Sequence, residues 1–166
     1  MGIQEKVASL EEVAAYCREY RLNGKRVVLT FGAYDIIHPG HVLYLEKARA
    51  FGDVLIVRVT DDATVRQSKG PERPINKDED RAMVVAAFES VGHVIIFNEE
   101  DCVLIEAFQP DVCVYSQTSK KTMNDRLSQQ ALVAAQGGEI VCLTELFERH
   151  TSDIIQEIRA SEKSEY

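Results

Sequence analysis

Two histidines, His38 and His41, stand three residues apart in the segment TFGAYDIIHPGH, which covers residues 30–41. At the start of a helix this spacing places both imidazoles on one side, so both rings can face a single ligand. Gly32 permits a close approach of the backbone to that ligand. A helix beginning near Gly40 would direct its unpaired amides and the positive end of its dipole toward the same point. The segment therefore predicts a phosphate-binding turn.

A basic stretch in an otherwise acidic chain is the second feature that could do chemistry. Lys69, Arg73, Lys77 and Arg81 recur in and after the polar loop predicted at residues 68–76. The whole chain has 166 residues, 19 of them basic and 27 acidic, and a net charge of −8. Charge pattern alone favours a solvated surface for this stretch, and the alternative is a set of cations that hold phosphate groups. The acidic balance argues against nucleic acid or a membrane as partners, since both need clustered positive charge.

Histidines beside helix amides, with lysine and arginine nearby, suit a reaction in which the protein stabilises charge. Phosphoryl and nucleotidyl transfer are such reactions, because their barriers fall mainly through alignment of the reactants and neutralisation of the oxygens that gain charge. The chain has no Walker A lysine motif, and its glycines do not match the dinucleotide fingerprint. A P-loop kinase and a dehydrogenase are therefore disfavoured.

Apolar, β-branched runs alternate with helical patterns along the chain. Strands are predicted at residues 27–30, 54–60, 93–97, 111–115 and 139–143. Helices are predicted at residues 10–20, 40–50, 78–90, 100–108 and 126–136, and from Thr151 through Ile158. This alternation predicts an α/β fold with a doubly wound, five-stranded parallel sheet, right-handed crossovers and helices on both faces.

The carboxyl ends of the predicted strands should form the binding edge of this sheet. Besides the phosphate-binding turn, that edge should gather Asp61, Lys69, Tyr115 and Thr151, the last of which caps the final helix. The segment 116–124 is polar and aperiodic, so it is predicted to be a loop or a mobile lid.

Length and composition indicate a single domain over residues 1–166, with a leading helix within residues 1–24 and a frayed tail at residues 161–166. No apolar run is long enough to span a membrane, and the first residues lack the pattern of a secretory signal. A cytoplasmic protein is therefore expected. The four cysteines are widely spaced, which predicts buried reduced thiols and no structural zinc.

The pattern T-x-G-x-(F/Y)-D-x-x-H-x-G-H, which runs from Thr30 to His41, resembles the signature of the cytidylyltransferase-like nucleotidyltransferases. Further segments are similar to the adenylyltransferase part of ADP-heptose synthases: residues 10–25, 68–76, 80–81, 97–101 and 110–112. The resemblance covers nearly the whole chain and implies a Rossmann-like fold. It also implies transfer of a nucleoside monophosphate from a nucleoside triphosphate to a sugar or polyol phosphate, with release of pyrophosphate.

The resemblance assigns roles to individual residues. His38 and His41 would donate hydrogen bonds to the α- and β-phosphates, and Lys69 would hold the triphosphate. Arg73 and Arg81 would meet the acceptor phosphate. The residues expected around the nucleotide are Thr30, Phe31, Gly32, Ala33, Tyr34, Asp35, Gly40, Asp61, Tyr115, Thr151 and Ser152, with Asp35 orienting the motif. Mg²⁺ would be held mainly by the triphosphate, with no metal ligands assigned to the protein, and a homodimer is expected.

Two segments depart from the pattern of the ADP-heptose synthases. Residues 115–119, at the end of the fourth strand, read YSQTS where a Lys-Gly-x-Asp-Tyr-like segment is usual, and residues 148–152 read ERHTS where Gly-x-Ser-Thr-Thr is usual. Both segments lie where the base and the acceptor would be selected. Three readings stay open. They are adenylyl transfer to heptose 1-phosphate or a related sugar phosphate, cytidylyl transfer to glycerol 3-phosphate or another polyol phosphate, and nucleotide binding without turnover by a regulator or assembly partner.

Overall fold

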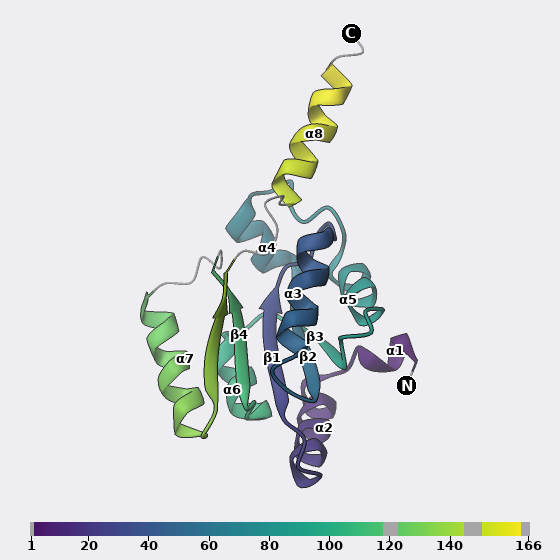
Figure 1. Ribbon diagram of the computed structural model, residues 1–166. Coiled ribbons are helices and arrows are strands. Elements are labelled where there is room, and N and C mark those ends of the chain that lie inside the picture. The colour runs from purple at the N-terminus through teal and green to yellow at the C-terminus, as the bar shows by residue number, and fades with distance from the viewer. Residues whose placement is uncertain (1, 118–122, 145–150, 164–166) are drawn as a thin grey trace.

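Five parallel strands form one sheet in the computed structural model, which describes residues 2–117, 123–144 and 151–163 (Figure 1). The strands are β1 Val27–Gly32, β2 Val54–Thr60, β3 His93–Phe97, β4 Val112–Ser116 and β5 Glu139–Leu143. Their order is β3-β2-β1-β4-β5, and every neighbouring pair is parallel. The predicted five-stranded parallel sheet is confirmed. β1 continues past the predicted end at Thr30 as far as Gly32, which brings it directly to the start of the histidine turn.

The helices lie between and beside the strands. They are α1 Ile3–Lys6, α2 Leu10–Leu22, α3 Pro39–Arg49, α4 Asp62–Lys69, α5 Asp78–Ala86, α6 Asp101–Phe108, α7 Met123–Ala135 and α8 Thr151–Lys163. α1 and α4 lie outside the predicted set, so Lys69 ends a helix instead of lying in a loop. Hydrophobic periodicity does not predict α4, because Val65 is the only buried residue of this helix. α8 extends to Lys163, so residues 161–163 of the predicted tail are helical.

Helices cover both faces of the sheet, as the alternation of elements predicts. α2, α6 and α7 pack on one face, over a core that includes Leu29 and Ile56. α3 and α5 pack on the other face, over a core that includes Val28 and Val57. Adjacent residues of one strand therefore serve opposite cores, which explains why these strands are continuous apolar runs. The Rossmann-like, doubly wound architecture is confirmed.

β1 stands at the centre of the sheet, and the direction of the crossovers changes there. The chain moves from β1 through β2 to β3 on one side, and β4 and β5 lie on the other. Ligands in open parallel sheets bind at the carboxyl end of such a switch point. The turn that follows β1 occupies this position, and α8 extends from the same end of the molecule (Figure 1).

All four cysteines are reduced, and their burial follows their place in the sheet. Cys17 and Cys113 are buried, Cys102 is half-buried and Cys142 is exposed. The prediction of a buried thiol is wrong for Cys142, because it lies on the edge strand β5, where one side of the sheet meets solvent. None of the helices in the described ranges is long and apolar enough to cross a membrane.

Candidate active site

The two histidines of the turn lie against each other where α3 begins. Their ring centroids are 4.0 Å apart and the rings are tilted by 40°. His38 is the N-cap of α3, and its Nδ1 atom accepts a hydrogen bond from the amide of Gly40 at 3.2 Å. Because Nδ1 is the acceptor, Nε2 carries the proton in the neutral ring and is the nitrogen able to donate to a ligand. The structure therefore places two imidazoles and the positive end of a helix at one point.

Tyr34 packs its ring against the ring of His41. Its backbone has a φ of 51°, its side chain is buried, and its ring lies 5.4 Å from the His41 ring. Gly32 makes this arrangement possible, since a Cβ at that position would come within 2.7 Å of the Tyr34 ring. The packing of Tyr34 against this position is thus a physical reason for Gly32.

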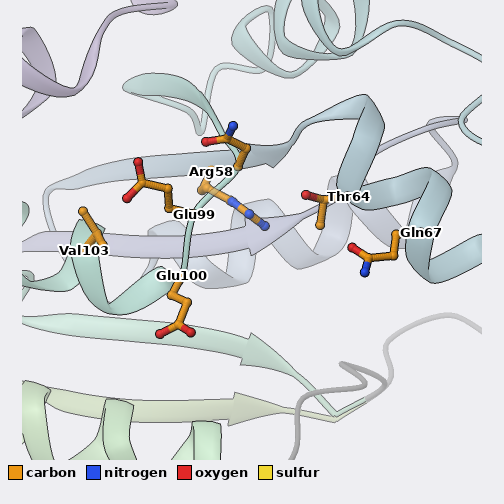
Figure 2. A pocket seen from close by; sticks show the side chains of 7 residues that line it. Arg58, Thr64, Gln67, Glu99, Glu100 and Val103 are labelled. Atoms are coloured by element: carbon orange, nitrogen blue, oxygen red, sulfur yellow. The ribbon is translucent and has the colours of Figure 1, made fainter.

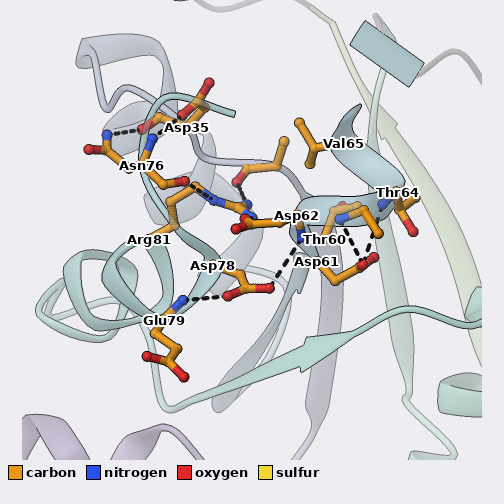
Figure 3. Close-up of polar contacts among 12 residues, drawn as sticks. Asp35, Thr60, Asp61, Asp62, Thr64, Val65, Asn76, Asp78, Glu79 and Arg81 are labelled. Atoms are coloured by element: carbon orange, nitrogen blue, oxygen red, sulfur yellow. Dashed lines mark hydrogen bonds and ion pairs between the residues drawn. The ribbon is translucent and has the colours of Figure 1, made fainter. Parts of the chain in front are cut away.

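Asp35 fastens the turn to the loop that follows α4. Its buried carboxylate accepts hydrogen bonds from Arg73 Nε at 2.6 Å and from the amides of Ile75 and Asn76 at 2.8 and 3.0 Å. The Asn76 side chain returns a hydrogen bond to the Asp35 carbonyl at 2.6 Å (Figure 3). The charge of Arg73, a predicted acceptor contact, is therefore paired with Asp35, and its side chain is only 14% exposed.

Arg81 has a different place from the predicted contact with an acceptor phosphate. Its side chain is fully buried and all three guanidinium nitrogens bond to protein groups. Nε donates to the Asn76 carbonyl at 3.0 Å, Nη2 pairs with Asp62 at 2.8 Å, and Nη1 donates to the Ala33 carbonyl (Figure 3). This corrects the prediction, because a guanidinium enclosed in this way positions the turn and the start of α4 and does not reach a ligand.

A cavity of about 360 Å³ brings together predicted residues from distant parts of the chain. Lys69 and Arg73 line it from the end of α4 and the following loop, and Ser152 lines it from the start of α8. Arg159 adds a further cation and pairs with Glu72. Thr151 ties this cavity to the histidine turn, since its hydroxyl donates to the Ile36 carbonyl at 3.1 Å. We refer to this space as the Lys69 cavity.

Three predicted nucleotide contacts use their side chains inside the protein. The Thr30 hydroxyl is buried and hydrogen-bonds with the Tyr44 hydroxyl at 2.7 Å and the Val114 carbonyl at 2.9 Å. Asp61 caps α4 and accepts from two amides of its first turn. Tyr115 is buried against Phe31, with ring centroids 4.9 Å apart, and burial raises the pKa of its hydroxyl well above the ordinary value. The Thr30 hydroxyl is therefore used within the protein, whereas Asp61 Oδ1 is a buried atom without a hydrogen-bond partner among the described residues and the Tyr115 hydroxyl is buried.

The model of the cytidylyltransferase-like family matches residues 29–157, a range that contains the histidine turn, the Lys69 cavity and the start of α8. The chain belongs to the cytidylyltransferase-like family. It is a nucleotide-binding nucleotidyltransferase, and its paired histidines lie inside the part of the chain that defines the family.

Individual members of this family with assigned names match most of the chain. Bifunctional protein HldE of Geotalea uraniireducens is 39% identical over 155 residues, which are 93% of this chain and 31% of that protein. Bifunctional protein HldE of Wolinella succinogenes is 46% identical over 112 residues, which are 67% of this chain and 24% of that protein. The chain thus spans less than a third of the length of these two relatives.

Solved structures share the fold of this family member. The lipopolysaccharide core biosynthesis protein from Thermoplasma volcanium matches with a TM-score of 0.62 and 24% identity, over 76% of this chain and 100% of that one. Pantoate-beta-alanine ligase from Francisella tularensis matches with a TM-score of 0.58 and 13% identity, over 88% of this chain and 68% of that one. At these identities the likeness establishes the architecture alone.

The sequence reasoning missed residues that hold the site together. Asp62 and Asn76 anchor Arg81, and Arg159 lines the Lys69 cavity. The Asp61-Asp62 pair follows β2 at the expected binding edge of the sheet, which indicated a role for these carboxylates. Their spacing could not show which of the two faces Arg81. The remaining predicted features, residues 118–119 and 148–150, lie outside the described residues, as does most of the predicted lid.

Proposed function

We propose that this nucleotidyltransferase moves an adenylyl group from ATP to a sugar phosphate such as heptose 1-phosphate and releases pyrophosphate. The observation that carries the proposal is the pair of imidazoles at the start of α3, with His38 oriented to donate through Nε2, joined through Thr151 to a cavity lined by Lys69 and Arg73. The similarity to HldE proteins over most of the chain, together with the resemblance to ADP-heptose synthases, supports ATP and a heptose phosphate as the first substrates to test.

In this reaction an oxygen of the acceptor phosphate forms a bond to the α-phosphorus of the nucleotide. The bond from that phosphorus to the bridging oxygen breaks, and the electron pair leaves with pyrophosphate. His38 and His41 would donate hydrogen bonds to the α- and β-phosphate oxygens as charge moves to the leaving group. The α3 amides would act in the same direction, and Lys69 would neutralise the triphosphate. Preorganised donors of this kind lower the barrier because they need no rearrangement during the reaction.

Mg²⁺ would arrive with the triphosphate and offset part of its charge. No group of three or more His, Cys, Asp or Glu side chains in the described ranges is arranged to hold a metal ion. Asp35 pairs with Arg73, and Asp62 pairs with Arg81. We propose that phosphate oxygens and water would hold most of the ion's coordination sites, which Mg²⁺ accepts readily.

Cytidylyl transfer to glycerol 3-phosphate or another polyol phosphate is the second candidate. Ser116 stands at the end of β4, where the resemblance to ADP-heptose synthases leads one to expect a lysine-containing segment. A base or acceptor different from those of the heptose enzymes would be accommodated by such a change.

Pyrophosphate release over four nucleoside triphosphates, crossed with heptose 1-phosphate, other sugar 1-phosphates and glycerol 3-phosphate, tests the proposal. Turnover of ATP with heptose 1-phosphate supports it, and turnover of CTP with a polyol phosphate supports the second candidate. Nucleotide binding without turnover on any acceptor would establish the non-catalytic reading instead.

A His41→Ala variant tests the role of the paired imidazoles. We expect turnover to fall by at least about a hundredfold, the scale of losing one preorganised donor. Glu46→Ala, at an exposed position on the same helix, is the matched control and should retain wild-type turnover. Near-normal turnover in a folded His41→Ala protein would contradict the mechanism.

A further inference from the structure

A second cavity, of about 530 Å³, opens at the carboxyl edge of β2 and β3 and contains none of the residues predicted for the site. Arg58 of β2, Thr64 and Gln67 of α4, and Asn98 and Glu99 of the loop after β3 line it (Figure 2). We call it the Arg58 pocket. α4 forms part of its wall and also carries Lys69 at its end, so one helix borders both cavities.

Arg58 is a buried cation that forms no ion pair with a carboxylate in the described residues. Its residue is 8% exposed, and its side chain runs from β2 toward Thr64 (Figure 2). Nη1 donates to the Thr60 hydroxyl at 2.7 Å, whereas Nε is buried without a hydrogen-bond partner in the part of the chain that the structure describes. Burial lowers the pKa of Arg58, although the charges of Asp101 and Asp61 act in the opposite direction. A buried donor without an acceptor is unfavourable, and Arg58 lines the pocket, so its guanidinium group is the cation that a ligand in the pocket would meet.

Two hydrogen bonds connect Arg58 to the histidine turn. The Thr60 hydroxyl accepts from Arg58 and donates to the Gly32 carbonyl at 3.2 Å. Gly32 is the last residue of β1, from which the turn departs, and Arg58 lies opposite Phe31 in the sheet register. The pocket is therefore adjacent to the strand end that begins the catalytic segment.

The lining of the pocket combines donors with acceptors. Gln67 and Asn98 contribute amides, Thr64 contributes a hydroxyl, and Glu99 contributes a carboxylate. Glu100, a further lining residue, adds a second carboxylate, which disfavours a dianionic phosphate at this place. Hydroxyl groups both donate and accept hydrogen bonds, so this mixture suits a polyhydroxylated ligand.

We propose that the Arg58 pocket binds the hydroxyl-bearing sugar body of the acceptor, with the Arg58 guanidinium donating to its oxygens, and that the pocket thereby selects the acceptor. The inference rests on the proposed function, since the acceptor phosphate must reach the histidine turn. It divides the acceptor between two places: the phosphate lies at the turn and the sugar lies in the pocket.

Steady-state kinetics of Gln67→Ala and Asn98→Ala test this division, because both positions are exposed and tolerate truncation. We expect the KM for heptose 1-phosphate to rise about tenfold, the scale of one lost hydrogen bond to a ligand, while the KM for ATP stays within about twofold. Glu106→Ala, exposed on α6 outside the lining, is the matched control. Unchanged acceptor KM in both variants, or an equal rise in the KM for ATP, would overturn the proposal.

Binding measured without turnover separates this inference from the proposed function. In ¹⁵N NMR spectra, heptose 1-phosphate should shift the side-chain amide signals of Gln67 and Asn98, and inorganic phosphate should leave them in place. Arg58→Lys keeps the charge but loses the planar fork. In this variant the dissociation constant obtained from titrating the shift should rise about tenfold. If these signals shift but no nucleotide is transferred, the sugar site stands and the proposed function fails. If heptose 1-phosphate turns over without shifting them, the proposed function stands and the sugar site is wrong.

Discussion

His93 offers a sharp test of the electrostatic reasoning, because it is a buried titratable group remote from the proposed chemistry. It begins β3, is fully buried, and stacks on Tyr16 with ring centroids 4.4 Å apart. Its Nε2 atom hydrogen-bonds with the Tyr20 hydroxyl at 2.8 Å. Burial, and secondarily the charge of Lys6, lowers the pKa of His93 from 6.5 to about 4. The imidazole is therefore neutral in the folded protein at neutral pH.

This shift couples stability to pH in a defined direction. Between about pH 4 and pH 6.5 the unfolded chain binds a proton at His93 that the folded protein does not bind. Its contribution to the free energy of unfolding is greatest above pH 6.5 and falls as the pH decreases toward 4. With these two pKa values, the loss between pH 7 and pH 5 is about 2 kcal/mol.

Urea unfolding at pH 7 and pH 5 measures this loss, followed by far-UV circular dichroism because the chain has no tryptophan. His93→Gln removes the titration and keeps an acceptor for Tyr20. We expect the wild-type protein to lose about 2 kcal/mol more than the variant between the two pH values. Other groups titrate in both proteins and cancel in the difference. Tyr20→Phe should retain the steep pH dependence, and equal pH dependence in wild type and His93→Gln would refute the reasoning.

Two further predictions concern buried groups. Arg81→Met should lower the free energy of unfolding by about 3 kcal/mol, because it leaves Asp62 and two carbonyls without their donor. Arg81→Lys should recover part of this free energy in urea titrations. Unchanged stability of both variants would show that the network contributes nothing to folding. Cys142 should react with a water-soluble thiol reagent much faster than Cys17, because Cys142 is exposed and burial raises the pKa of Cys17 to about 12. Mass spectrometry of partially labelled protein measures the order of reaction. Modification of Cys17 before Cys142 would contradict the prediction.

Much of the architecture could be predicted from local patterns. The runs that contain Val28 and Val57 are β-branched over their whole length, and this is the pattern that a strand buried on both faces requires. α4 could not be predicted in the same way, because a short helix with one buried residue has almost no apolar periodicity. Its polar residues instead border the two cavities. Their role there depends on lining residues that are far away in the sequence.

In the candidate site, too, local spacing predicted some features and the tertiary structure decided others. The spacing of His38 and His41 was sufficient to predict adjacent imidazoles, since residues three apart at a helix start lie on one side whatever the rest of the fold does. The ligand contact that the family resemblance implied for Arg81 had no such local basis. Which way that side chain faces depends on Asp62 and on the Ala33 carbonyl, which the folded chain brings to it.

Sequence by itself therefore determined the family, the strands and the paired histidines of this protein, because each depends on residues that are neighbours along the chain. The tertiary structure alone decided that Lys69 and Ser152 share a cavity, that Arg81 is enclosed, and that Arg58 is a buried cation facing a second cavity. Within its strand Arg58 is one residue of an apolar run. It becomes a candidate for substrate selection only in the folded chain, where it is buried and lines a cavity together with residues of α4, of α6 and of the loop after β3.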